Sequence, residues 1–176
     1  MDANGGEPSE RYQISEAYAG RGDNHVHINL MLGSRGGPVG QTFLTVLASP
    51  RPGHVPFLVV LQPNVPVWPP VLYVNKAEIH GDDHARVTWG ASQAGVAEGM
   101  RDAVKAGALD GYDRDDVLII IAVFVGPTAR DEALLRANSR EAMRLALLRA
   151  GSKEGYAADF LDESLEPFNS FYRMPR

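Results

Sequence analysis

The 176-residue sequence contains no cysteine. Without thiols, the protein cannot form disulfide bonds, use a thiolate nucleophile or build a zinc site on cysteine. Long apolar segments are also missing, because the longest run, Val117–Val125, is far shorter than the roughly 20 residues of a membrane-spanning helix. The opening stretch MDANGGEPSERYQ has no apolar core of the kind that marks a secretory signal peptide. We therefore expect a cytoplasmic protein with no membrane partner.

Positive charge is scarce: 17 lysines and arginines stand against 22 aspartates and glutamates, which gives a formal net charge of −5. Non-specific binding of nucleic acid needs a basic surface, so we expect no nucleic-acid partner. The sequence has no dinucleotide-binding fingerprint and no Ser-His-Asp grouping. Residues 33–38, GSRGGP, lack the Gly-Lys-Ser/Thr ending of a phosphate-binding loop. None of these common signatures of catalysis or nucleotide binding is present.

The chain does have enough apolar material for one domain, since hydrophobic residues make up 44% of it. We place this domain at residues 11–150. The polar residues 1–10 are expected to form a disordered leader, and residues 151–176 a C-terminal tail extension.

Apolar periodicity predicts five strands and three helices in the order β-β-α-β-β-α-β-α. The expected strands span residues 11–20, 25–33, 56–62, 71–79 and 117–125. The expected helices start near Pro38, which suits a first turn, and span 91–107 and 128–150, with Ser92 and Thr128 as caps. This order favours an α+β fold in which helices cover one face of a mixed sheet.

The pattern of apolar, proline and polar residues also gives three predictions of local structure. The helix after Pro38 is expected to bury Phe43, Leu44 and Leu47. Residues 63–70, which contain four prolines, are expected to form an extended connector. Residues 80–86, HGDDHAR, are expected to form a polar loop.

The strand at 25–33 alternates between two kinds of side chain. Its apolar positions are Val26, Ile28, Leu30 and Leu32. Its other positions are His25, His27, Asn29 and Met31. Because successive side chains point to opposite faces of a strand, this strand has a core face and a largely polar second face.

The residues alone leave three roles open for the histidines on that polar face. His25 and His27 could bind a metal ion together with His80 and His84, although nothing in the spacing brings the two pairs together. One strand histidine could act as an acid–base group, because the unperturbed pKa of imidazole lies near neutrality. A histidine that only packs and forms hydrogen bonds is the third role. We expect no metal site.

A family resemblance favours the acid–base role. Residues 27–38, HINLMLGSRGGP, resemble the active-site strand of the formaldehyde-activating enzyme family. The resemblance continues in order through 61–79, LQPNVPVWPPVLYVNKAEI, and 89–104, WGASQAGVAEGMRDAV, and then through 115–125 and the helix with Asn138. It covers roughly residues 11–150.

The resemblance implies a carbon–oxygen lyase that condenses formaldehyde with tetrahydromethanopterin to the methylene adduct and water. It also implies a fold like the second domain of ribosomal protein S5. The reduced pterin is a co-substrate, and no tightly bound cofactor is implied. Family members resemble one another in forming rings of five, with the pterin between neighbouring subunits, so we expect a homopentamer. The aromatic residues of the tail, Phe168, Phe171 and Tyr172, are expected to cover a neighbouring subunit.

Carried over by position, the resemblance makes His27 the acid–base residue. The implied substrate contacts are Asn29, Leu58, Lys76, Glu78 and Gln93. Asn29 stands where the family usually has Asp, and Glu78 where it usually has Thr. These departures leave open a non-catalytic formaldehyde- or pterin-binding paralogue, or an enzyme that joins formaldehyde to a different amine. Lys76 could orient a polar edge of the substrate or form a Schiff base with formaldehyde.

Overall fold

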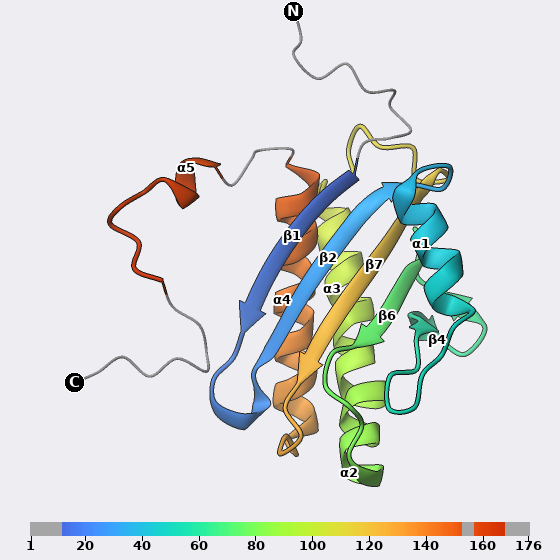
Figure 1. The fold of residues 1–176 in the computed structure, drawn as a ribbon, viewed down its shortest axis with the longest axis vertical. Coiled ribbons are helices and arrows are strands. Elements are labelled where there is room, and N and C mark those ends of the chain that lie inside the picture. The colour runs from blue at the N-terminus through green and yellow to red at the C-terminus, as the bar shows by residue number, and fades with distance from the viewer. Residues whose placement is uncertain (1–11, 153–156, 168–176) are drawn as a thin grey trace, which may run out of the picture.

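The computed structural model describes residues 12–152 and 157–167, so the expected leader at 1–10 lies outside the described residues. The main sheet has five strands in the order β1-β2-β7-β6-β3 (Figure 1). These strands are β1 Tyr12–Ala19, β2 Val26–Ser34, β7 Val117–Val125, β6 Val71–Asn75 and β3 Phe57–Leu58. Two further short strands, β4 Val60–Gln62 and β5 Val65–Pro66, form a separate ladder.

The main sheet is mixed, because β6 and β7 run parallel while the other neighbours are antiparallel. A parallel pair needs a long crossover connection. Here the crossover consists of α2 Gly81–Arg86, the π-helical segment η3 Val87–Ser92 and α3 Gln93–Lys105. The remaining helices are η2 Gly22–Asn24, α1 Pro38–Leu47, α4 Glu132–Gly151 and α5 Ala157–Phe160. The predicted α+β class is confirmed.

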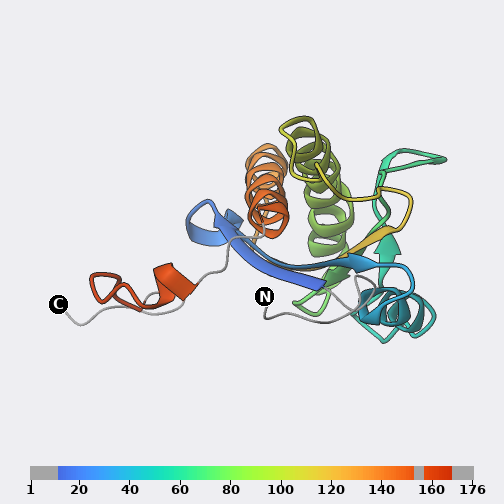
Figure 2. The ribbon, with the colours of Figure 1, turned by 90° about the horizontal axis from the view of Figure 1, so that it is seen from above.

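Helices cover both faces of the sheet, and the expectation of one covered face was wrong. Figures 1 and 2 show α3 and α4 on one side of the sheet and α1 on the other. α1 packs Val39 and Phe43 onto an apolar end of the second face, formed by Leu72, Leu118 and Ile120. Among residues 12–152 and 157–167, no helix lies over the other end of that face.

The side of α1 that contacts the sheet also differs from the prediction. Phe43 is buried, but Leu44 is 68% and Leu47 37% exposed. Val39 lies four residues before Phe43 and therefore shares its side of the helix. Leu44 is rotated away from that side and faces outward, whereas Leu47, four residues after Phe43, is the last residue of the helix and stays partly exposed.

The predicted alternation along β2 is confirmed. Val26, Ile28, Leu30 and Leu32 are all fully buried against α3 and α4. His27 and Asn29 lie on the opposite face and are only half-buried. This second face belongs to the side of the sheet on which α1 lies.

Three strand and loop boundaries need correction. The stretch 56–62 is two short strands that are interrupted at Val59, whose backbone N–H donates to the carbonyl of Val71 at 2.9 Å. The connector 63–70 contains β5, and Asn64 turns the chain with a φ of 67°, which asparagine tolerates. β6 ends at Asn75 instead of continuing to residue 79.

Residues 80–86 belong mostly to α2 and do not form a loop. His84 is fully buried in this helix. Its Nδ1 accepts the backbone N–H of His80 at 3.1 Å, and its Nε2 donates to the carbonyl of Val125 at 3.1 Å. A histidine whose two ring nitrogens are both hydrogen-bonded can be buried in a core. Because the buried residue of this helix is polar, the apolar periodicity of the sequence did not reveal the helix.

Neither predicted cap is used as a cap. Ser92 lies within a continuous helical stretch, and its buried hydroxyl lies 3.0 Å from Tyr73 Oη and 2.9 Å from Ser139 Oγ. This chain of hydroxyls joins the sheet to α3 and α4, and burial raises the pKa of Tyr73. Thr128 precedes α4, whose N-cap is Asp131.

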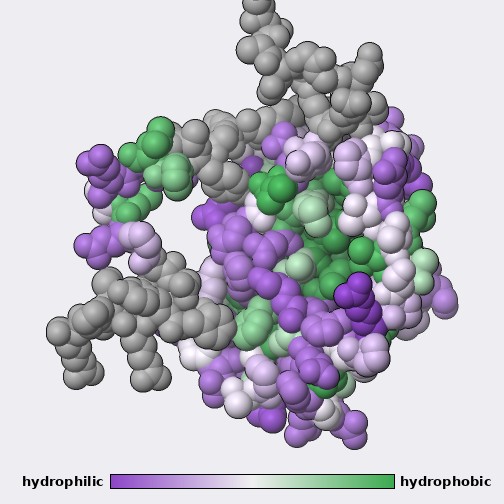
Figure 3. All heavy atoms as spheres, viewed as in Figure 1, coloured by the Kyte–Doolittle hydropathy of each residue, from purple (hydrophilic) through white to green (hydrophobic). Residues whose placement is uncertain are grey.

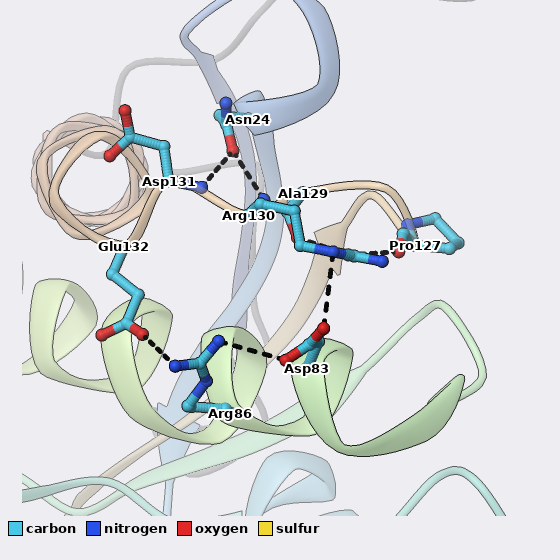
Figure 4. A network of polar contacts seen from close by, with 8 residues as sticks. All are labelled: Asn24, Asp83, Arg86, Pro127, Ala129, Arg130, Asp131 and Glu132. Carbon is cyan, nitrogen blue, oxygen red and sulfur yellow. Dashed lines mark hydrogen bonds and ion pairs between the residues drawn. The ribbon is translucent and has the colours of Figure 1, made fainter.

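A polar network ties the turn before β2 to the beginning of α4 (Figure 4). Asn24 Oδ1 accepts the backbone N–H groups of Arg130 and Asp131, both at 3.2 Å. Arg86 forms ion pairs with Asp83 and Glu132 and so links α2 to α4. The network holds the turn from which the chain enters β2.

α3 and α4 come into close contact at two glycines. A Cβ added at Gly95 would lie 2.2 Å from the carbonyl oxygen of Arg136, and one at Gly99 would lie 2.2 Å from that of Arg140. The two glycines are one helical turn apart and face the same partner helix. Backbone contact at this distance requires residues without a side chain.

Candidate functional site

The end of the sheet that α1 leaves open carries a group of polar side chains from β1, β2 and the end of β6. Glu16 comes from β1, His27 and Asn29 come from β2, and Lys76 directly follows β6. We call these four residues the His27 cluster. Figure 3 shows this face of the molecule, on which hydrophilic side chains lie beside a hydrophobic area. The structure therefore brings together three of the predicted site residues and adds Glu16.

Hydrogen bonds order the His27 cluster. His27 Nε2 lies 2.7 Å from Glu16 Oε1. Lys76 Nζ lies 3.0 Å from His27 Nδ1 and donates to Asn29 Oδ1 at 2.7 Å. A carboxylate only accepts hydrogen bonds, so the proton of a neutral His27 is on Nε2, and Nδ1 accepts from Lys76.

The surroundings of His27 and Lys76 disfavour the protonated forms of these two side chains. Burial lowers the pKa of His27, the Lys76 ammonium lowers it further, and Glu16 acts in the opposite direction. Burial also lowers the pKa of Lys76, again opposed by Glu16. The lowered pKa of His27 and its hydrogen bond to Glu16 favour the neutral ring, with its proton on Nε2 and with Nδ1 free to accept from Lys76.

Lys76 is positioned by the turn that ends β6. Its backbone N–H donates to the carbonyl of Val123 at 2.8 Å, which continues the pairing of β6 with β7 by one residue. The buried side chain of Asn75 donates to the carbonyls of Gly53 at 2.6 Å and Ala77 at 2.7 Å, which fixes the chain on either side of Lys76. The side chain of Lys76 therefore extends from a backbone that is held rigidly.

The small side chain of Ala122 lies at the centre of the sheet face beneath Lys76. Ala122 pairs with Asn29 on one side and with Val74 on the other, so all three side chains share this face. A methyl group at this position leaves room for Lys76 to extend over β7 and reach His27 and Asn29 on β2.

His25 is buried and supports the site by packing. It precedes β2 and is only 9% exposed. Its ring centroid lies 5.3 Å from that of Phe124 and 5.4 Å from that of Tyr18. Tyr18 on β1 and Phe124 on β7 are the cross-strand neighbours of His27. The aromatic stack therefore forms one wall of the site.

Leu58 and Gln93 lie together in a second place, a pocket of about 400 Å³ at the β3 edge. Its lining is mainly apolar and aromatic and consists of Val55, Phe57, Leu58, Val60, Trp89 and Gln93. Gln93 Oε1 accepts the backbone N–H of Val60 at 2.8 Å. Its volume and mainly apolar lining resemble those of small-molecule sites, but the pocket is wide open to solvent.

The pocket and the His27 cluster are separate within one chain. Leu58 pairs with Leu72, which precedes Lys76 by four residues. At about 3.3 Å per residue along a strand, the backbones of Leu72 and Lys76 are about 13 Å apart. Within the described chain, Glu78 forms no hydrogen bond or ion pair with either group, and it packs close to Gly53.

Sequence reasoning missed Glu16. The signal for it is the antiparallel register of β1 on β2, in which Glu16 pairs with Asn29 and so shares its face. That register becomes visible only when the two strands are paired. Across residues 12–152 and 157–167, no group of three histidine, aspartate or glutamate side chains is arranged to hold a metal ion. None of the helices in these ranges is both long and apolar enough to cross a membrane.

The chain belongs to the formaldehyde-activating enzyme family, which it matches over residues 14–171. It is 40% identical over 137 residues to the 5,6,7,8-tetrahydromethanopterin hydro-lyase of Methanosarcina barkeri, an alignment that covers 78% of this chain and 77% of that protein. It is also 36% identical to the bifunctional enzyme Fae/Hps of Methanosarcina mazei over 139 residues, which is 79% of this chain. The alignment covers 36% of that longer relative.

Proposed function

We propose that this chain condenses formaldehyde with tetrahydromethanopterin to the methylene adduct and water. Membership of the family and the similarity to a tetrahydromethanopterin hydro-lyase support this reaction. The observation that carries it is the His27 cluster, in which a strand histidine is held between a carboxylate and an amine. We further propose that the reaction takes place in the cytoplasm.

The cluster suits the difficult step of this reaction. An amine that attacks formaldehyde gives a carbinolamine, whose hydroxyl is a poor leaving group and needs a proton as it departs. His27 is the acid–base residue in our proposal, and such a group typically contributes about 10²–10⁴-fold to the rate. Glu16 holds the ring through Nε2, which directs Nδ1 toward Lys76 and the open side of the sheet.

The direct test is to mix the purified protein with formaldehyde and tetrahydromethanopterin and to follow formation of the methylene adduct above the spontaneous rate. We expect clear acceleration. The same assay with tetrahydrofolate tests the acceptor. A rate equal to the spontaneous one with both pterins, from a folded protein, would contradict the proposal.

A different amine acceptor is the second candidate, and Asn29 and Glu78 favour it. Asn29 accepts a hydrogen bond from Lys76 but carries no negative charge. Glu78 is exposed and carries a charge where the family usually has an uncharged threonine. A protein that binds formaldehyde or a pterin without turnover would retain the pocket but show no acceleration with any acceptor.

The two departures give a testable prediction. If they weaken binding of tetrahydromethanopterin, the double change Asn29→Asp and Glu78→Thr should tighten it, because it restores the carboxylate beside Lys76 and removes the charge from position 78. We expect a several-fold lower dissociation constant by titration. The single change Glu78→Thr separates the two contributions. An unchanged affinity of the double variant would locate the divergence elsewhere.

We propose that the active form is a homopentamer in which the site is completed between subunits. The separation of the pocket from the His27 cluster supports this, because a neighbouring subunit is needed to bring one to the other. Several large apolar side chains are exposed: Tyr12, Ile14, Leu58, Trp68 and Trp89. The tail residues Phe168, Phe171 and Tyr172, predicted to cover a neighbour, lie outside the described residues.

The assembly makes a second prediction. Light scattering should give a mass several times that of the 19.1 kDa monomer. Because neither half can enclose the substrate alone, specific activity should fall together with the mass when the protein is diluted. A monomeric mass, or constant specific activity across dissociation, would refute a shared site.

A further inference from the structure

We infer that Lys76 is the amine that first receives formaldehyde, with His27 as its base and Glu16 as the residue that orients His27. This inference rests on the proposed function and deepens it, because it assigns a covalent role to one residue of the same site. The chemical class of the ligand is a small aldehyde, which is held as an iminium and passed to an amine acceptor.

The geometry of Lys76 is that of a nucleophile paired with its base. Nζ lies 3.0 Å from His27 Nδ1, the nitrogen that carries no proton when Nε2 donates to Glu16. The order carboxylate, imidazole, nucleophile is the general arrangement by which a base activates an otherwise protonated group. Here the nucleophile is an amine in place of a hydroxyl.

Lys76 Nζ also has a donor direction to spare. Within the described residues it makes two hydrogen bonds, to His27 and Asn29, out of the three that an ammonium can donate. The residue is exposed on the sheet face that α1 leaves open. An aldehyde oxygen can therefore approach Nζ from the solvent side while both existing contacts remain.

The charges around Lys76 fit a reactive amine better than a structural ion pair. The side chain that it contacts on β2 is the neutral amide of Asn29, and the only carboxylate of the cluster, Glu16, is bonded to the far nitrogen of His27. A lysine held for its charge alone would contact a carboxylate directly. Burial lowers the pKa of Lys76, which makes the free amine more accessible.

The steps balance without an oxidant or a reductant. His27 Nδ1 takes a proton from Lys76, and the free amine attacks the formaldehyde carbon to form a carbinolamine. The imidazolium then returns its proton to the hydroxyl group, which leaves as water while the nitrogen lone pair forms the iminium. A first amine of the acceptor adds to the iminium carbon, and its proton passes to the lysine nitrogen as the bond from that nitrogen to the carbon breaks. The one-carbon unit is then an iminium on the acceptor. A second acceptor nitrogen closes on this carbon, and the proton that it loses returns Lys76 to the ammonium form.

This sequence also resolves a conflict between the role of His27 and its surroundings. A neutral His27 has no proton on Nδ1 to donate to a leaving hydroxyl. If it first removes the proton from Lys76, it becomes the acid that the next step requires. The same residue then serves as base and as acid in consecutive steps.

Reductive labelling tests the inference. A brief exposure of the full-length protein to ¹³C-formaldehyde and cyanoborohydride converts an iminium to a stable methylamine, which peptide mass spectrometry locates. Lys105, exposed near the end of α3, is the internal reference. We expect Lys76 to label at least 10-fold faster than Lys105. His27→Phe and Glu16→Gln should lower this ratio several-fold and leave Lys105 labelling unchanged.

Activity assays complete the test. Lys76→Arg keeps the positive charge but cannot form the iminium, so it should lose acceleration of the condensation, whereas Lys105→Arg should keep it. Labelling of Lys76 no faster than Lys105, or an active Lys76→Arg enzyme, would overturn the inference and leave the proposed function intact. Fast, His27-dependent labelling without condensation on tetrahydromethanopterin would instead overturn the proposed acceptor and support the inference.

Discussion

Replacing His27 with alanine should reduce the accelerated condensation rate about 10²–10⁴-fold, to near the spontaneous rate. The variant removes the ring that contacts both Lys76 and Glu16, and so separates Glu16 from the rest of the cluster. The fold should survive, because the His27 side chain is 29% exposed and lies on the face opposite the main core. Rate measurements across formaldehyde concentrations, with circular dichroism for the fold, provide the check.

The matched control is His80→Ala. His80 is exposed, and the hydrogen bond that it gives to His84 comes from its backbone and is retained in the variant. We expect nearly unchanged turnover. His25→Ala is a poorer control, because His25 is buried and stacked on Phe124. Turnover like that of the wild type in His27→Ala would remove His27 from the mechanism.

Replacing Gly99 with alanine should lower the stability of the protein by forcing α3 and α4 apart. The new Cβ would lie 2.2 Å from the carbonyl oxygen of Arg140, so α3 and α4 would have to move apart. Overpacking of this kind costs about 1–3 kcal/mol, against which the higher helix propensity of alanine returns at most about 1 kcal/mol. We expect a lower free energy of unfolding in denaturant titrations at fixed protein concentration.

Gly90→Ala is the control for this change. Gly90 lies in the same helical crossover, is exposed, and a Cβ added there would meet no atom within 4 Å. The substitution should be neutral or slightly stabilising, because glycine is a poor helix former. Equal destabilisation by the two changes would show that the contact between α3 and α4 is not the cause.

The sequence predicted the parts of this fold in which local pattern and burial agree. The alternation along β2 and the apolar run of β7 gave both central strands almost to the residue. The first strand was equally close, since β1 spans Tyr12–Ala19. In each of these strands, the buried face is visible in the sequence as an alternation of period two or as a continuous apolar run.

The errors arose where tertiary contacts decide the local structure. α2 was missed because its buried residue is a histidine that is paired at both nitrogens. Ser92 reads as a cap from its residue type, but its hydroxyl is bonded to Tyr73 and Ser139, which are distant in the sequence. Propensity describes a residue and its neighbours along the chain and carries no information on such partners.

The same dependence on contacts between distant residues explains which parts of the proposed site could be predicted. His27, Asn29 and Lys76 were identified through the family resemblance, and the structure brings them together. Glu16 depends on the pairing of β1 with β2 and was not found. The placement of Leu58 and Gln93 in a separate pocket was equally invisible, because it depends on how the β3 edge meets α3.

The strand order has a consequence for how the two parts of the site fluctuate. β2, which carries His27 and Asn29, is bonded along its whole length between β1 and β7, so its amides are released to solvent only when the domain unfolds. β3, which carries Leu58, has two paired residues at an edge of the sheet. Its amides should exchange through small local openings at far lower cost. The proposed acid–base residue is thus expected to keep a persistent position, whereas the wall of the pocket is expected to open locally many times during the lifetime of the fold.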